Sequence, residues 1–234
     1  MNDLLDSAVA AHGGLDRWNQ VKLITFDASV TGAFWNLKGQ GDALKDVRLQ
    51  VDTTRQRVAI EFAGQDKRAV FEPNRVVLQR RDGTLIEARD EPERSFDGHQ
   101  FLTPWDDIHL AYFVGEAQWT YVNMPFLATR PGFAAEEIAP IEADGETWRR
   151  LAVTFPGHIA THTRRQVLCF GPDGLLRRHD FTIDLLGGVP SQLEAAGYRD
   201  AAGIILPTTR RAYDQLTPDH PLMVAIDMDD ITIG

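Results

Sequence analysis

Two histidines and an aspartate in one stretch of the chain are the residues best suited to acid–base chemistry. His162 precedes one strand-like run, and His179 and Asp180 lie in the next run, beyond a turn at residues 171–174. An imidazole changes charge near neutral pH and can therefore exchange a proton or anchor a polar group. His162, His179 and Asp180 are the candidate catalytic residues if the protein is an enzyme.

The turn predicts how the two runs pair. Placing Phe170 opposite Leu175 puts His179 opposite Gln166, and alternation then places His162 and His179 on the same face of the hairpin. In this register the two histidines lie four residues apart along the sheet, roughly 13 Å at the rise of a strand. A single metal ion shared by both histidines is therefore not expected.

Two interpretations of this hairpin remain open. In the functional one, His162 and His179 lie at the rim of a cavity and exchange protons with a substrate or anchor it. In the structural one, both histidines are partly buried and hydrogen-bonded, and Arg165 forms a cross-strand ion pair with Asp180.

Asp106, Asp107 and His109 form a second polar group, at the start of an expected helix. An Asp/His pair beside a cavity could orient a proton transfer. Acidic residues in a first helical turn are also favoured by the helix dipole alone. Both interpretations remain open for these residues.

Aromatic side chains are concentrated in the middle of the chain, where residues 101–133 hold eight of the 21 aromatics. Such a cluster is typical of a hydrophobic core, and it also suits a pocket for an apolar or aromatic molecule. The candidate ligand-binding residues are Trp105, His109, Tyr112, Phe113, Trp119, Phe126 and Arg178.

The elements that position these residues follow from periodicity. Residues 1–20 are expected to be helical, residues 21–89 to hold the first strands, and residues 147–234 to hold the remaining strands. Thr103 and Pro104 have the pattern of an N-cap and first helical residue, which predicts a central helix over 103–127. Residues 125–140 are expected to be irregular.

These elements predict one α+β domain over residues 1–234. Its centre is a long, mostly antiparallel sheet, one face of which must be covered. The central aromatic helix closes that face, and an apolar cavity is expected between the helix and the sheet.

Two segments resemble the LolA/LppX-like proteins of bacteria. They are residues 10–18, which read AAHGGLDRW, and residues 198–208, in which YRD is followed by GIILPT. The resemblance implies a strongly curved antiparallel sheet, a half-open β-barrel closed by helices over a hydrophobic cavity. It also implies a lipophilic ligand, since family members carry lipoprotein acyl chains or other lipids.

Four further segments are closer to an uncharacterised cytoplasmic branch of this family. They are residues 103–113, 160–164, 175–181 and 186–188. The same architecture hosts an enzyme of violacein biosynthesis that acts on aromatic intermediates without a cofactor. The resemblance therefore implies either a carrier or a cofactor-independent enzyme.

Composition restricts the class of partner. The net charge of -10 argues against nucleic acid, whose binding rests on clustered Lys and Arg. No run is apolar for long enough to span a bilayer, and residues 1–6 have no signal-peptide pattern, so a cytoplasmic location is expected. Cys169 is the single cysteine, which excludes an intrachain disulfide.

No cofactor or metal is expected, because no phosphate-binding glycine loop, CxxC pair, nucleophile elbow or dinucleotide fingerprint occurs. The function expected is binding of a lipophilic or aromatic small molecule in the apolar cavity. One alternative is a cofactor-independent enzyme of secondary metabolism with His/Asp acid–base groups. Another is a structural or interaction protein with a filled core.

Overall fold

The computed structural model describes residues 3–215, 217 and 219–234. Its α-helices are α1 (Asp3–Ala11), α2 (Leu15–Trp18), α3 (Ala33–Leu37) and α4 (Asp107–Asn123). Short 3-10 turns are η1 (Pro92–Phe96), η2 (Phe126–Thr129) and η3 (Asp184–Leu186).

Strands make up most of the molecule. They are β1 (Leu23–Thr31), β2 (Val47–Asp52), β3 (Val58–Phe62), β4 (Arg68–Glu72), β5 (Arg75–Gln79), β6 (Leu85–Asp90), β7 (Ala134–Ala143), β8 (Glu146–Thr154), β9 (Arg165–Phe170), β10 (Leu176–Ile183), β11 (Val189–Ala201), β12 (Ile204–Tyr213) and β13 (Leu222–Ile233). Within the described residues these 13 strands form one antiparallel sheet in the order β6-β5-β4-β3-β2-β1-β13-β12-β11-β10-β9-β8-β7.

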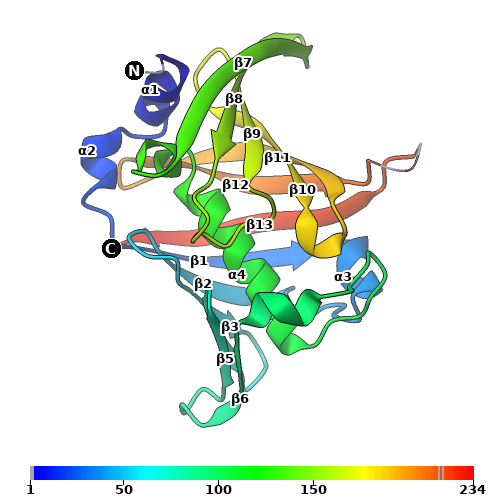
Figure 1. The fold of residues 1–234 in the computed structure, drawn as a ribbon. Coiled ribbons are helices and arrows are strands. Elements are labelled where there is room, and N and C mark those ends of the chain that lie inside the picture. The colour runs from blue at the N-terminus through cyan, green and yellow to red at the C-terminus, as the bar shows by residue number, and fades with distance from the viewer. Residues whose placement is uncertain (1–2, 216, 218) are drawn as a thin grey trace.

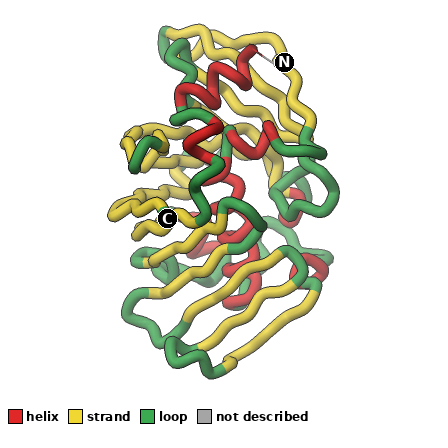
Figure 2. Tube along the Cα trace, turned by 90° about the vertical axis from the view of Figure 1, so that its left-hand side faces the viewer, coloured by secondary structure: helices red, strands yellow, loops and turns green. Residues whose placement is uncertain are grey.

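This order explains the position of the central helix. Each half of the chain makes a run of antiparallel neighbours, and the two runs join where β1 pairs with β13. The strands β6 and β7 are therefore at opposite edges, and the segment between them has to cross the sheet. Helix α4 makes this crossing through the interior of the curved sheet (Figure 1). In Figure 2 the helix lies between strands of the lower and upper parts of the molecule.

The helix α4 is buried on all sides. Every residue from Ile108 to Asn123 is buried, as expected for a helix enclosed by a curved sheet. Strands that face it alternate, and in β2 the buried residues are Val47, Leu49 and Val51. The single domain with a curved, unclosed antiparallel sheet and few helices confirms the predicted α+β class.

The predicted start of the central helix is wrong. The N-cap is Asp106, whose carboxylate accepts a hydrogen bond from the backbone N–H of His109 at 2.8 Å. The Thr103 hydroxyl instead accepts from the backbone N–H of Gln100, in the loop before the helix. A tertiary contact also holds this loop, because the backbone N–H of Trp105 donates to the carbonyl of Lys38.

The helix also ends earlier than the predicted residue 127, since α4 stops at Asn123, just before Met124-Pro125. The irregular segment predicted over residues 125–140 is wrong, because Ala134–Ala143 forms the edge strand β7. Most residues of β7 are exposed or half-buried, so this strand has no clear hydrophobic alternation to reveal it.

The predicted register of the β9–β10 hairpin is also wrong. Phe170 pairs with Leu176, and an irregularity between Leu176 and Arg178 shifts the remaining pairs. His179 therefore lies opposite Leu168. The predicted ion pair between Arg165 and Asp180 is absent, because Asp180 lies opposite Val167 and pairs with its neighbour Arg178 at 2.6 Å.

Candidate functional site

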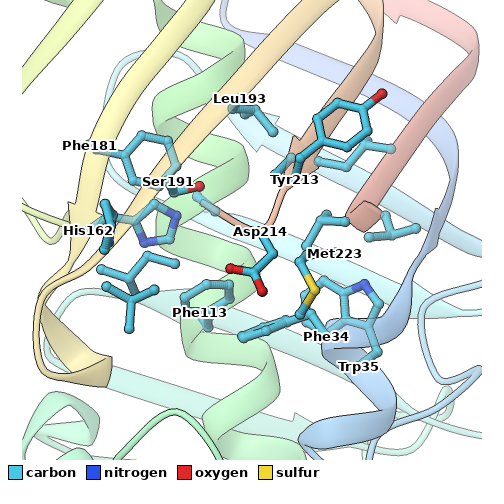
Figure 3. A pocket seen from close by; sticks show the side chains of 18 of the residues that line it. Phe34, Trp35, Phe113, His162, Phe181, Ser191, Leu193, Tyr213, Asp214 and Met223 are labelled. Carbon is cyan, nitrogen blue, oxygen red and sulfur yellow. The ribbon is translucent and has the colours of Figure 1, made fainter. Parts of the chain in front are cut away.

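A pocket lies between helices α3 and α4 and strands β10 to β13 (Figure 3). Its cavity volume is about 80 Å³. The lining is mostly apolar, and it includes Phe34, Trp35, Phe113, Phe181, Leu193, Ala212, Met223 and Ile226.

Aromatic rings build one wall of the pocket. The ring centroid of Phe34 in α3 lies 5.7 Å from that of Phe113 in α4, and Trp35 meets Phe113 edge to face at 6.3 Å. Such pairs gain energy beyond the area that they bury, and they fix the short helix α3 against α4.

Lys38 holds the adjoining loop. Its ammonium group is buried and lies within hydrogen-bond distance of the carbonyls of Gln100, Phe101 and Thr103, at 3.3, 2.7 and 3.3 Å. It also lies 4.6 Å from the ring centroid of Trp105. Because Phe101 lines the pocket, Lys38 helps to shape the rim.

A buried carboxyl–imidazole–phenol series forms a polar part of the wall. His162, from the loop before β9, places its Nδ1 2.9 Å from Oε1 of Glu116 and its Nε2 3.0 Å from the hydroxyl of Tyr121. The imidazole is packed between Phe113 and Phe181, with both ring centroids at 4.7 Å. His162 and Tyr121 line the pocket, whereas Glu116 is not among the lining residues.

Burial sets the electrostatics of this series. It raises the pKa of the Glu116 carboxyl, which the hydrogen bond from His162 partly opposes, and it raises the pKa of the Tyr121 phenol. With its Nδ1–H donating to Glu116, His162 accepts the Tyr121 hydroxyl at Nε2. The series can therefore move a proton to or from a molecule beside Tyr121.

A second buried histidine lies outside the pocket lining. His179 in β10 places its Nε2 2.6 Å from Oε1 of Gln166, whose amide nitrogen donates to Thr161 and Thr163. Burial, followed by the charge of Arg210, lowers the pKa of His179 well below its ordinary value. His179 is therefore neutral near neutral pH.

The predicted site residues are only partly brought together. Phe113 and His162 line the pocket. Tyr112 and Trp119 lie on the opposite side of α4, where Tyr112 meets Phe71 and the Trp119 indole donates to the carbonyls of Asp52 and Arg55.

Three other candidates are not among the lining residues of the pocket. Trp105 packs under Lys38, and Phe126 stacks on Trp18 with ring centroids 4.1 Å apart. His109 belongs to the capping box of α4, and its Nε2 lies 3.2 Å from the carbonyl of Ser95.

Arg178 and Asp180 pair with each other on the face of β10 opposite His179. Alternation along β10 therefore keeps Asp180 away from both histidines, and Arg178 away from the pocket. The Arg178 guanidinium lies 5.8 Å from the ring centroid of Trp148.

Sequence analysis missed Glu116, Gln118 and Arg210. Glu116 and Gln118 lie in the central helix, which the sequence predicts to be buried. A buried polar side chain needs a hydrogen-bond partner, so their polarity is the signal that could have identified them. The Oε1 atom of Gln118 has no partner among the described residues, and Gln118 lines the pocket. No local pattern distinguishes Arg210 from Arg211, because strand neighbours differ only in the face they take.

Among the described residues, no group of three or more His, Cys, Asp or Glu side chains is arranged to hold a metal ion.

No helix in the described part of the chain has both the length and the apolar character that crossing a membrane requires.

Comparison with known proteins found solved structures of similar fold. No family model matches the sequence, and no curated protein matches it either. A domain from Vibrio parahaemolyticus named for outer membrane lipoprotein sorting superposes with a TM-score of 0.58 at 10% identity, over 99% of this chain and 91% of that one.

Two other structures are similar. A LolA superfamily protein from Nitrosomonas europaea has a TM-score of 0.55 at 9% identity, over 99% of this chain and 92% of that one. A DUF1329 family protein from Desulfovibrio piger has a TM-score of 0.54 at 12% identity, over 98% and 91%. Together with the unclosed, curved sheet, these likenesses show that the chain has a LolA-like fold.

Proposed function

We propose that the protein binds a lipophilic or aromatic small molecule in the pocket between α4 and strands β10 to β13. The observation that carries this proposal is an opening lined mainly by aromatic and aliphatic side chains, with His162, Tyr121 and Gln118 as convergent polar groups. The fold of a domain named for lipoprotein sorting supports the same class of ligand.

A fluorescent apolar probe tests the proposal. Phenylnaphthylamine brightens in apolar surroundings, and we expect it to bind the purified protein in a saturable way. Ser191 lines the pocket from β11 and is half-buried, so Ser191→Trp is expected to fill the pocket and weaken binding by about tenfold or more.

A matched control uses the same strand. Glu194 is exposed on β11, so Glu194→Trp adds the same indole outside the pocket and is expected to leave the affinity unchanged. Equal affinities of the wild type and both variants would place the probe elsewhere and contradict the proposal. Comparing native and denaturing mass spectra then identifies any molecule that the protein carries.

A second candidate function is a cofactor-independent acid–base enzyme. The Glu116–His162–Tyr121 series favours it, because the phenol at the pocket wall is coupled to a buried imidazole and carboxyl. Tyr121→Phe removes the hydroxyl and keeps the ring. We expect this variant to bind phenylnaphthylamine normally and to lose the turnover that the wild type shows.

Mass spectrometry of small molecules supplies the assay. The protein is incubated with a deproteinised cell extract, and compounds that disappear or form with time are compared between the wild type and Tyr121→Phe. A compound that only the wild type converts supports the enzyme. An extract left unchanged by the wild type contradicts it and leaves the binding function.

A further inference from the structure

A buried cation lies next to the inner end of the pocket. Arg210 in β12 is 2% exposed, and no Asp or Glu in the described residues lies within ion-pair distance of it. Its Nη2 donates to the carbonyl of Tyr121 at 2.8 Å, but Nε and Nη1 have no hydrogen-bond partner among the described residues. A charge buried in this way carries a large desolvation cost and calls for a compensating group.

The end of helix α4 accounts for part of this arrangement. The residue four positions after Tyr121 is Pro125, which has no N–H to donate to the Tyr121 carbonyl. Arg210 takes that place, and the negative end of the helix dipole favours its charge. This contact uses one donor of a guanidinium that has five, so Nε and Nη1 remain to be explained.

His179 supplies another unpaired atom nearby. The amide nitrogen of Gln166 donates to Thr161 and Thr163, so its Oε1 accepts from Nε2–H of His179. Nδ1 of His179 then carries a lone pair, and it has no partner in the described residues. His179 and Arg210 both lie against Tyr121, at 5.9 Å between rings and 5.3 Å from guanidinium to ring.

The register of the sheet connects these groups to the pocket. Arg210 lies directly opposite Ile226 of β13, and Ala212 is the next residue of β12 on the same face. His179 lies opposite Leu193, which in turn lies opposite Ala212. Ile226, Ala212 and Leu193 all line the pocket, so the unpaired atoms belong to side chains immediately beyond its inner end.

Charge is distributed unevenly along the pocket. Asp214 lines it four residues after Arg210, roughly 13 Å away along the strand (Figure 3). The buried Glu116 carboxyl is in contact with His162. A molecule in the pocket therefore meets a carboxylate at the end near Asp214 and a cation at the inner end.

We propose that the ligand is a lipophilic anion, such as an alkanoic or aromatic carboxylate, whose head group binds the guanidinium of Arg210 at the inner end of the pocket. Nε and Nη1 lie on different edges of the guanidinium, and each can donate a charge-assisted hydrogen bond to an oxygen of the head group or of a bridging water. His179 Nδ1 accepts a hydrogen bond from a hydroxyl or water beside the head group. The inference rests on the proposed binding function and specifies its ligand class.

Two dyes that differ only in charge test the inference. Anilinonaphthalene sulfonate is phenylnaphthylamine with an added sulfonate, and both report binding by fluorescence. We expect the wild type to bind the sulfonate about tenfold or more tightly than the neutral dye, as for hydrogen bonds to a charged group. Decanoic acid is expected to displace the dye at lower concentration than decanol.

Variants assign the preference to Arg210. Arg210→Met is expected to bind both dyes alike, and Arg210→Lys is expected to keep part of the preference. Arg211 is the next residue, on the other face of β12, where it pairs with Asp227 at 2.6 Å. Arg211→Met therefore removes an equal charge outside the pocket and is expected to keep the full preference.

The outcomes separate this inference from the function on which it rests. A wild type that binds both dyes alike, and decanol as well as decanoic acid, overturns the anionic ligand and keeps the apolar one. A wild type that binds neither dye overturns the binding function itself. A preference that persists in Arg210→Met but is lost in Arg211→Met places the anion on the outer face and also overturns the inference. The two wild-type comparisons test the inference whether or not the variants fold.

Discussion

The two sides of helix α4 face different surroundings. Tyr112, Gly115 and Trp119 point toward strands β2 to β5, where the contacts are close and largely apolar. Phe113, Ala117 and Tyr121 point toward strands β10 to β13 and line the pocket. One helix thus joins a closely packed half of the sheet to an open half.

The packed side leaves no space beside the helix. A Cβ atom placed on Gly115 would lie 2.2 Å from Cγ of Phe71, so only glycine allows this approach of helix and sheet. The Trp119 indole, a polar group on this side, donates to two backbone acceptors. This side contributes packing energy and fixes the position of α4.

The open side holds several buried polar groups that lack partners or have shifted pKa values. They include Glu116, Gln118, His179 and Arg210. Such groups lower stability, and proteins retain them mainly where they serve a function. We therefore expect packing on the β2 to β5 side to contribute more to stability, and binding or chemistry to take place on the pocket side.

Phe71→Ala gives the largest expected effect. Removing this ring from the packed side is expected to lower the free energy of unfolding by about 3–5 kcal/mol, measured by urea denaturation. Phe181→Ala on the pocket side is expected to cost about 1–2 kcal/mol, because the space it leaves joins an existing opening. Equal losses in the two variants would contradict the difference between the sides.

His12, which packs near Tyr198 of β11, is expected to make the stability of the protein sensitive to acid. Burial lowers the pKa of His12 to about 4, and its ring lies 6.0 Å from that of Tyr198. The unfolded chain binds this proton near pH 6.5, so between pH 6.5 and 4 the unfolded state holds more protons. Stability is therefore expected to fall as the pH decreases through this range, by up to about 3 kcal/mol.

His12→Gln tests this titration, with urea denaturation at several pH values as the measurement. The variant is expected to lose less stability than the wild type on acidification from pH 6.5 to 4, although His179 titrates in the same direction. Identical pH profiles for the wild type and His12→Gln would show that His12 has the same pKa in the folded and unfolded chain, and would refute the prediction.

Gly115→Ala probes the close approach directly. Alanine favours a helix over glycine by about 1 kcal/mol, but its methyl group would overlap Phe71, and we expect a net loss of about 2 kcal/mol. Ala117→Leu places a larger side chain on the pocket side. It is expected to change stability by less than about 1 kcal/mol and to weaken binding of phenylnaphthylamine. A Gly115→Ala protein as stable as the wild type would show that the packed side can accommodate the methyl group, and would contradict the prediction.

Tyr121→Phe and Tyr112→Phe make the finest comparison. The Tyr121 hydroxyl lies 3.0 Å from Nε2 of His162, and its loss leaves a buried acceptor unpaired, at a cost of about 1 kcal/mol. Loss of the Tyr112 hydroxyl is expected to cost less than about 0.5 kcal/mol. Thermal unfolding of the two variants measures the two losses of stability. A larger loss in Tyr112→Phe than in Tyr121→Phe would contradict the prediction.

Much of the fold could be predicted from local patterns. Alternation in β2 and in its neighbours and the presence of a helix after Asp106 follow from short-range chemistry, and the structure confirms them. The edge strand β7 was not predicted because an exposed strand carries little hydrophobic alternation. The hairpin register was wrong because Phe170 pairs with Leu176 instead of Leu175, and an irregularity after Leu176 shifts the later pairs by one more residue.

The candidate site was harder to predict than the fold, because it depends on contacts between distant parts of the chain. Phe113 and His162 were named from their types, and both line the pocket. Tyr112 and Trp119 share a helix with Phe113, but the rotation of that helix turns them toward β2 to β5. Helical periodicity shows which residues share a face, and it does not show which half of a curved sheet that face meets.

By itself, the sequence determined the strand alternation, the buried central helix and the class of fold, because these depend on neighbours within a few residues. The tertiary structure decided which polar groups meet. His162 lies 46 residues from Glu116, and Arg210 lies 89 residues from Tyr121. These contacts exist because α4 crosses from one edge of the sheet to the other, and strand pairing brings both ends of the chain beside it.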